Sequence, residues 1–184
     1  IDDICLKGDF SKVRWVAPGG TTFQESVMNG LDYLDGRISD DDQALIHYGV
    51  SPFVSDEVIS DAIRVCKLHG NASPAHSQVY LAATKGDGES TTEFLDRDQI
   101  MVFNSPQALR YGYAKWVYAE GKRRGLIEKV EPHTTSLMLA LGERVWFSKG
   151  LTSNIKITTP EDLRMFEGWV LYERVHAVGK GGDS

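Results

Sequence analysis

Short apolar runs alternate with amphipathic helical patterns along most of this chain, and that alternation restricts the fold more than any other feature. Residues 12–20 have the pattern of a strand, and a helix capped near Thr22 follows them. Residues 44–47 have the pattern of a buried strand, and the next helix begins at its cap Ser55 and stops at Gly70. Strands that alternate with helices are typical of parallel sheets with crossover helices. The sequence therefore predicts a Rossmann-like α/β fold, with a mainly parallel sheet flanked by helices.

Residues 79–97 break this alternation. Two strand-like limbs surround Lys85-Gly86-Asp87-Gly88, a strong hairpin turn signal, and the segment has no helix of its own. We therefore expect residues 79–97 to form a β-arm that projects from the main sheet. A two-stranded ribbon is only marginally stable by itself, so the arm also predicts a homodimer in which a partner subunit supports it.

The last third of the chain returns to the alternating pattern. We expect a helix after Pro106, a short helix over 135–142 and a strand within 144–150. A strand over 154–159 then leads into a closing helix that starts at Pro160. The final residues, 179–184, have the composition of a disordered tail.

Length and charge limit the classes of function. The 184 residues suffice for one sizeable core, so a single domain over 1–184 is expected. A net charge of −6 argues against a nonspecific binder of nucleic acid or of membrane surfaces, because both need clustered Lys and Arg. Cys5 and Cys66 form no C-x-x-C pair, and no run reaches the roughly 18 apolar residues of a membrane span. These features favour a cytoplasmic protein.

The stretch SNIKITTPEDLRMFEGWVL, residues 153–171, places a lysine where an anion would bind. Ligands of open α/β sheets lie beyond the carboxyl ends of the strands. There Lys156, with Thr158 beside a helix start, would be well placed to hold phosphate oxygens. In the alternative, Lys156 points to solvent from an edge strand, and Thr159 only caps the helix while Asp162 completes a capping box. Spacing alone slightly favours this alternative.

Four motifs add a resemblance: GG followed by ESVMNGL, then SPFVSDEVI, then LDRDQI with NSPQALRY, and last NIKITTPEDL. In this order they resemble the 2-C-methyl-D-erythritol 4-phosphate cytidylyltransferases and the related ribitol 5-phosphate cytidylyltransferases, over nearly the whole chain. The resemblance implies a magnesium-dependent enzyme that joins CTP to a sugar or polyol phosphate and releases pyrophosphate. It also implies a role in isoprenoid or teichoic acid and capsule biosynthesis. Such enzymes are homodimers in which a β-arm of each subunit reaches the other's site.

The resemblance also implies roles for individual residues. Lys156 is expected to be the catalytic lysine that contacts phosphate, with Thr158 in the same motif binding substrate. Arg97 matches an arginine that grips the acceptor's phosphate from the partner subunit, and Ser105 keeps the hydroxyl of the usual threonine. The residues expected near the cytidine are Gly19, Gly20 and Ser26.

Departures from the family pattern support a second hypothesis. The family's glycine-rich nucleotide loop has no counterpart in this chain, so we expect that N-terminal loop to be missing from the given residues. Tyr48 stands where the family has an aspartate that binds magnesium, and Ser51 stands where it has an arginine, so the metal ligands are unknown. The chain is therefore either a divergent cytidylyltransferase or a non-catalytic relative that binds a nucleotide or phosphosugar, or that pairs with an active partner. Lys156 and Arg97 favour the first hypothesis, and Tyr48 favours the second.

Overall fold

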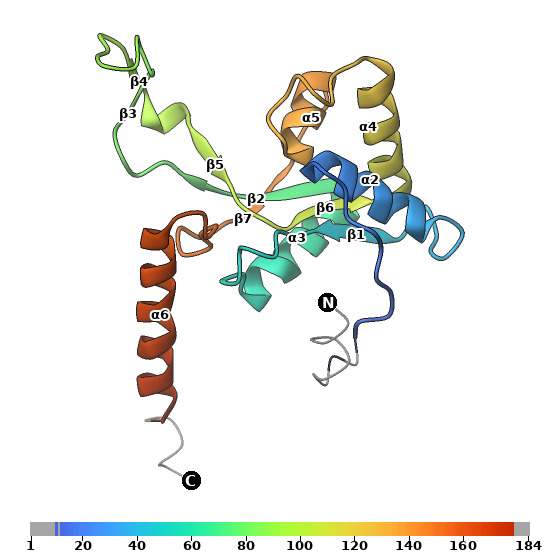
Figure 1. The fold of residues 1–184 in the computed structure, drawn as a ribbon, viewed down its shortest axis with the longest axis horizontal. Helices are drawn as coiled ribbons and strands as arrows, with labels where there is room; N and C mark the ends of the chain where they lie inside the picture. The colour runs from blue at the N-terminus through green and yellow to red at the C-terminus, as the bar shows by residue number, and fades with distance from the viewer. Residues whose placement is uncertain (1–9, 11, 179–184) are drawn as a thin grey trace. The chain divides into compact units, whose positions relative to one another are not determined.

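The computed structural model describes residue 10 and residues 12–178, and the chain divides into two compact units. One unit contains residues 1–42 and 110–144, and the other contains residues 43–109 and 145–184 (Figure 1). The tail over 179–184, expected to be disordered, lies outside the described residues.

Three helices build the described part of the first unit. They are α2 (Phe23–Leu34), α4 (Tyr111–Arg123) and α5 (Thr134–Leu141). The expected cap is present, because the Thr22 hydroxyl accepts a hydrogen bond from the Glu25 amide at 3.1 Å. Buried tyrosine hydroxyls join the helices: Tyr111 donates to the Leu31 carbonyl at 2.7 Å, and Tyr118 lies 2.8 Å from the Thr134 hydroxyl.

A mixed five-stranded sheet forms the centre of the second unit. Its strands are β1 (Gln43–Ile46), β2 (Asn71–Ser77), β5 (Met101–Phe103), β6 (Gln107–Arg110) and β7 (Phe147–Lys149). The order is β1-β6-β2-β5, and β7 also pairs with β2. Strand β2 is parallel to β7, with Ala75 opposite Lys149, and antiparallel to β5 and β6. The Tyr111 amide bonds the Asp42 carbonyl before β1, and Ser105 contacts His47 after it, so β1 runs opposite to β6. Strands β1, β2 and β7 therefore share one direction.

Helix α3 (Asp56–His69) packs on this sheet and makes the core of the second unit. The buried cluster consists of Ala62, Val65, Cys66, Ala72 and Ala108. The helix begins at its cap Ser55, whose hydroxyl accepts from the Val58 amide, and ends at Gly70 with φ 89°. Both ends were expected from the sequence. The sheet and its helices confirm the α/β class.

Two expected strands are not strands. Residues 13–20 belong to no strand, and their apolar side chains stay about half exposed, with Val13 at 48% and Trp15 at 44%. Residues 154–158 form no strand, whereas the strand expected within 144–150 is present as β7 (Phe147–Lys149). An apolar or β-branched run becomes a strand only where a neighbouring strand accepts its backbone hydrogen bonds.

Two real strands had no clear signal. Strand β2 is the most connected strand of the sheet, but its sequence NASPAHS is small, polar and interrupted by Pro74. Residues 107–110 form β6 rather than the start of a helix, and α4 begins only at Tyr111. The sheet buries Gln107, Ala108 and Leu109, so tertiary contacts override the helical pattern that follows Pro106.

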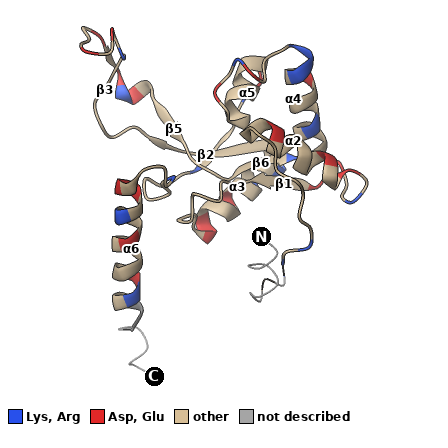
Figure 2. Cartoon of the chain, viewed as in Figure 1, with Lys and Arg blue, Asp and Glu red and all other residues tan. Residues whose placement is uncertain are grey.

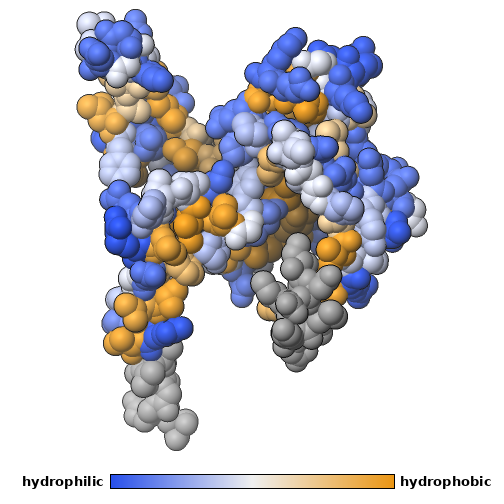
Figure 3. Space-filling view, viewed as in Figure 1, coloured by the Kyte–Doolittle hydropathy of each residue, from blue (hydrophilic) through white to orange (hydrophobic). Residues whose placement is uncertain are grey.

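The hairpin and the last helix expose much apolar surface. Strands β3 (Ala82–Ala83) and β4 (Phe94–Leu95) pair antiparallel around the expected turn, in which the Gly88 amide bonds the Lys85 carbonyl at 3.0 Å. Large exposed apolar side chains of this segment are Val79, Tyr80, Leu81, Phe94 and Leu95. Helix α6 (Pro160–Val178) contacts Phe53 through Phe166 and leaves apolar side chains exposed along its length (Figures 1 and 3). Its charged residues are of both signs (Figure 2).

Across the described residues, none of the helices combines the length and the apolar composition that a membrane crossing requires.

Candidate functional site

Polar side chains gather where β1 ends and β6 begins, within the second unit. The Ser105 hydroxyl lies 3.0 Å from His47 Nδ1, and Ser105 is 3% exposed. Buried Asn154 donates from Nδ2 to the Ser105 carbonyl at 2.6 Å. These contacts fix Ser105 from two sides at the edge of the sheet where β1, β2 and β7 have their carboxyl ends, which is the usual ligand edge of such sheets.

His47 Nδ1 and the Ser105 hydroxyl share a hydrogen bond. Partial burial of the imidazole lowers the pKa of His47, and a backbone hydrogen bond involving Ser51 opposes this effect only in part. A neutral imidazole has one acceptor nitrogen, and Nδ1 is the nitrogen next to the serine. The pair therefore orients the hydroxyl that the sequence predicts to bind substrate.

Lys156 lies in the connecting segment between β7 and α6, on the same edge. Its ammonium is 5.2 Å from the centroid of the Tyr48 ring, within the range of a cation–π interaction. The Tyr48 hydroxyl accepts a hydrogen bond from Gln107 Nε2 at 3.0 Å. One backbone bond, from the Ile157 amide to the Val50 carbonyl at 2.7 Å, ties the segment to the loop after β1. Lys156 is exposed, but it is directed over the Tyr48 ring rather than extended from an edge strand.

The start of α6 is closed by its own carboxylate. Asp162 Oδ2 accepts bonds from the Thr158 amide, the Thr158 hydroxyl and the Thr159 amide at 2.8 to 2.9 Å. The Asp162 amide donates back to the Thr159 hydroxyl at 3.2 Å. This is the capping box of the alternative hypothesis. The amide and hydroxyl of Thr158 are engaged by Asp162, and phosphate binding by Thr158 stays a prediction.

The capping box predicts a pH dependence. Hydrogen bonds from the backbone amides of Thr158 and Thr159 lower the pKa of Asp162 to about 2. A lowered carboxyl pKa stabilises the fold above the unfolded value, and that contribution is lost as pH falls through the folded value. We expect Asp162→Asn to be less stable than the wild type at pH 5, and the difference to shrink between about pH 4 and 2. Urea unfolding followed by helical circular dichroism measures this difference. A difference that stays constant down to pH 2 would contradict the carboxylate's role.

The residues expected near the cytidine lie at the start of α2 in the first unit. The Gly20 amide donates to the Ser26 hydroxyl at 2.9 Å, and this hydroxyl donates to the Thr22 carbonyl. A Cβ on Gly20 would lie 2.4 Å from Glu25 Cγ, so the close approach requires glycine. Asn29 Nδ2 bonds the Gly19 carbonyl at 3.3 Å. The structure thus brings Gly19 and Gly20, which precede α2, together with Ser26 in the first turn of that helix.

Arg97 lies at the base of the hairpin, in the single-turn helix η1 (Arg97–Gln99). Its side chain is exposed, and Nη1 donates to the Val79 carbonyl at 3.3 Å. This bond is to the same hairpin and not to Lys156, Ser105 or Thr158. The structure therefore brings Lys156 and Ser105 to one edge and leaves Arg97 on the hairpin.

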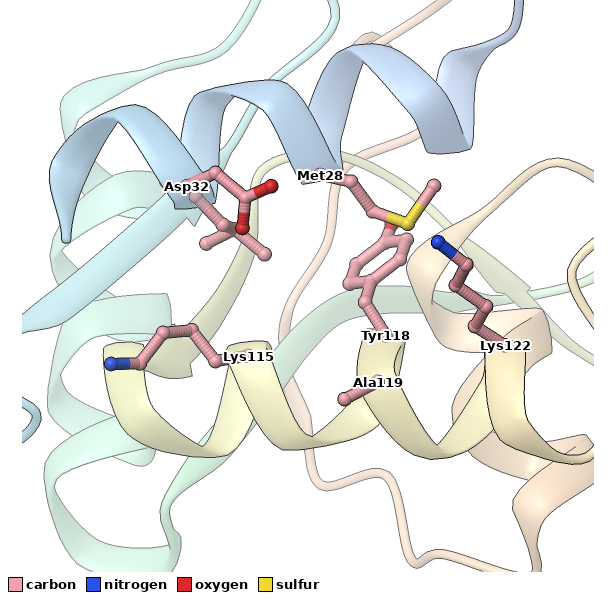
Figure 4. A pocket seen from close by; sticks show the side chains of 7 residues that line it. Met28, Asp32, Lys115, Tyr118, Ala119 and Lys122 are labelled. Carbon is pink, nitrogen blue, oxygen red and sulfur yellow. The ribbon is translucent and has the colours of Figure 1, made fainter.

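A separate pocket lies between α2 and α4 in the first unit (Figure 4). Its volume is ≈ 260 Å³, and its lining includes Met28, Tyr118 and Lys122. Lys115 at its rim is already paired with Asp35 at 2.8 Å and with Asp40 at 2.9 Å. The pocket contains none of the residues that the motifs predict to be functional, and its local charges largely neutralise one another.

Comparison with known proteins decides the family. The model of the 2-C-methyl-D-erythritol 4-phosphate cytidylyltransferase family matches residues 3–171. The chain belongs to this family. It is 32% identical to a ribitol-5-phosphate cytidylyltransferase of Lacticaseibacillus paracasei, over 86% of this chain and 68% of the relative. It is also 32% identical to a 2-C-methyl-D-erythritol 4-phosphate cytidylyltransferase of Clostridium novyi, over 91% of this chain and 69% of the relative.

A solved structure supports the fold. The 2-C-methyl-D-erythritol 4-phosphate cytidylyltransferase of Thermus thermophilus superimposes with a TM-score of 0.71 at 26% identity. The superposition covers 82% of this chain and 70% of that chain. The Rossmann-like fold expected from the sequence is therefore confirmed.

The donor set at the carboxyl edge does not suit the metal that a cytidylyltransferase of this family implies. Magnesium prefers anionic and neutral oxygen ligands, usually with at least one carboxylate. The side chains here are an imidazole, hydroxyls, amides and the Lys156 ammonium. Within residues 10 and 12–178, no group of three or more His, Cys, Asp or Glu residues could hold a metal ion. This edge therefore does not fit a protein-held magnesium ion.

Sequence reasoning missed two residues of the edge. Asn154 lies within the family motif NIKITTPEDL, and Gln107 lies within NSPQALRY. Both are 4% exposed and carry amide side chains. Polar side chains inside specific family motifs were the available signal, because an amide is buried only where it has partners.

Proposed function

We propose that this protein is a cytidylyltransferase that joins CTP to a sugar or polyol phosphate and releases pyrophosphate. The observation that carries the proposal is the match of residues 3–171 to the family, with the motif residues Lys156 and Ser105 at one sheet edge. The activities of its relatives indicate an acceptor of the methylerythritol phosphate or ribitol phosphate class. The protein would act in the cytoplasm, where CTP is available, in isoprenoid or teichoic acid and capsule biosynthesis.

In this reaction an oxygen of the acceptor's phosphate attacks the α-phosphorus of CTP. A new P–O bond forms, the bond between the α-phosphorus and the bridging oxygen breaks, and pyrophosphate leaves with the electron pair. Catalysis of such transfers consists mainly of positioning and of neutralising negative charge. Lys156 would neutralise phosphate charge, and Ser105, oriented by His47, would bind a substrate oxygen. Gly19, Gly20 and Ser26, at the start of α2, would lie near the cytidine.

Magnesium would enter this reaction on the nucleotide. The chain's own donors at the carboxyl edge do not suit the ion, whereas the triphosphate of CTP supplies anionic oxygens itself. A magnesium ion bound in this way would lower the negative charge on the triphosphate of CTP. The protein's residues would then bind and orient the complex.

The hairpin supports a homodimer. Tyr80 is 76% exposed, Leu81 is 80% exposed and Phe94 is 72% exposed, which is more apolar surface than a two-stranded ribbon keeps in water. A partner subunit would cover this surface and receive Arg97. We expect sedimentation to give a dimer at micromolar concentration, and Leu81→Asp to shift it to a monomer. The matched control is Val175→Asp on the exposed face of α6, which should leave the dimer intact. A wild-type monomer would contradict the proposal.

A second candidate is a non-catalytic relative that binds a nucleotide or phosphosugar. The specific observation in its favour is Tyr48, which takes the place of the family's metal-binding aspartate and is engaged by Gln107 and Lys156. Such a protein would keep the phosphate site without turnover.

A direct assay separates the two candidates. Purified wild-type protein is incubated with CTP, magnesium and one acceptor at a time, from ribitol, methylerythritol, glycerol and arabinitol phosphates, and pyrophosphate release is followed. The enzyme hypothesis predicts release that needs both CTP and one of these acceptors. Binding of CTP without release for every acceptor would favour the non-catalytic relative.

A further inference from the structure

Lys156 is held in place by an aromatic ring. Its ammonium lies 5.2 Å from the centroid of Tyr48, and a cation within about 6 Å of such a centroid is attracted by the ring face. The ring itself is anchored, because the Tyr48 hydroxyl accepts from Gln107 Nε2 at 3.0 Å and Gln107 is 4% exposed. Tyr48 thus holds a positive charge just beyond the end of β1.

Among the described residues, no carboxylate pairs with this charge. Lys156 takes part in none of the ion pairs of that part of the chain, whereas Lys149 in the adjacent strand pairs with Glu57. The acceptors around the edge are neutral amide oxygens. The side-chain oxygens of Asn104, Gln107 and Asn154 are buried and have no hydrogen-bond partner. The Lys156 charge therefore remains available to an anionic ligand.

The same charge disfavours a protein-held metal ion. A divalent cation bound by Tyr48 would meet the ammonium over the same ring, and like charges at such separations repel strongly. The Tyr48 hydroxyl is a neutral oxygen that already accepts from Gln107, so it is a poor magnesium ligand.

We propose that Lys156, seated on Tyr48, binds a phosphate group at this edge without a protein-held metal ion. Tyr48 is a positioning residue that acts through the lysine. The inference rests on the proposed function for the identity of the ligand, a nucleotide or a phosphate ester. It goes beyond that function because it makes phosphate binding by the protein independent of metal.

The test measures binding of inorganic pyrophosphate in EDTA by titration calorimetry. The wild type is expected to bind. Lys156→Met is expected to weaken binding about tenfold or more, because a charge-assisted hydrogen bond is lost. Lys149→Met, which removes a lysine already paired with Glu57, is the matched control and leaves the affinity unchanged. Lys156→Gln is a second variant that keeps a polar side chain at the exposed position.

Variants of Tyr48 separate positioning from a structural role. Tyr48→Phe keeps the ring and loses the hydroxyl, so pyrophosphate affinity should stay within about twofold of the wild type. Tyr48→Leu loses the cation–π seat and should weaken binding about threefold. A merely structural Tyr48 would give equal affinities for the two variants, because each also loses the bond from Gln107.

The metal alone is the second probe. The wild type is expected to leave the electron paramagnetic resonance spectrum of free Mn²⁺ unchanged at millimolar protein. Mn²⁺ binding that Tyr48→Phe abolishes would overturn the inference. Pyrophosphate binding that requires magnesium, or that Lys156→Met leaves unchanged, would overturn it as well, even if CTP turnover is observed. Metal-independent binding with the expected variant pattern and no CTP turnover would support the inference and refute the proposed function.

Discussion

The substitution Gly150→Ala is expected to lower the free energy of unfolding by about 3 kcal/mol or more. A Cβ on Gly150 would lie 2.6 Å from the Ala75 carbonyl carbon and 2.7 Å from the Ala75 nitrogen and oxygen. These are backbone atoms of the central strand β2, which cannot rotate away as a side chain can. The Gly150 amide also bonds the Ala75 carbonyl at 3.1 Å, and a shift that relieves the clash would weaken this bond. Urea denaturation gives the free energy of unfolding.

Gly168→Ala is the matched control. Gly168 lies inside α6, and a Cβ there meets no atom within 4 Å. Alanine is a better helix former than glycine, so this variant should gain about 0.5 to 1 kcal/mol of stability. A Gly150→Ala protein as stable as the wild type would show that the chain does not pass β2 as closely as described. An unstable Gly168→Ala protein would show that α6 is covered at that point.

Helix ends were the most predictable part of the fold. Thr22, Ser55, Gly70 and Gly142 mark the ends of helices in the sequence and in the structure. These signals are local, because a cap satisfies the backbone groups of its own first or last turn. The hairpin turn around Gly86 was predictable for the same reason, since its positive φ of 57° favours glycine.

Strands were less predictable, because a strand is completed by neighbours that are distant in the sequence. Strand β2 has a poor strand composition, but it bonds to β5, β6 and β7. The polar residues Asn71 and Ser73 are buried in it, and Asn71 Oδ1 accepts from the Trp146 amide at 3.1 Å. Residues 13–20, by contrast, have apolar side chains and no strand pairing. The decisive interactions in both cases are not visible in a local window.

The candidate site was predictable as a set of residues and not as a set of contacts. Motif resemblance singled out Lys156 and Ser105, and the structure places both at the carboxyl edge of the sheet. The sequence did not indicate that Lys156 lies on Tyr48, because those residues are far apart along the chain. The sequence allowed Thr158 either to bind phosphate or to lie beside a helix cap. The structure shows that its amide and hydroxyl donate to Asp162. The roles of Arg97, Gly19, Gly20 and Ser26 in binding remain predictions.

The second large effect is expected from Lys156→Met. The lysine's charge is available to phosphate, and the loss of one preorganised cationic donor typically lowers turnover about 100-fold. Because the side chain is exposed, the free energy of unfolding should change by no more than about 0.5 kcal/mol. The loss should appear in kcat/KM for CTP and for the acceptor. Lys149→Met should keep kcat/KM near the wild-type value.

The most direct test of the account is kcat/KM for pyrophosphate release from CTP and ribitol 5-phosphate or methylerythritol 4-phosphate, in the wild type and in Lys156→Met. The account predicts release by the wild type, about 100-fold less by the variant, and equal unfolding curves for the two proteins. Equal rates for the two proteins, or no release by the wild type with either acceptor, would contradict it.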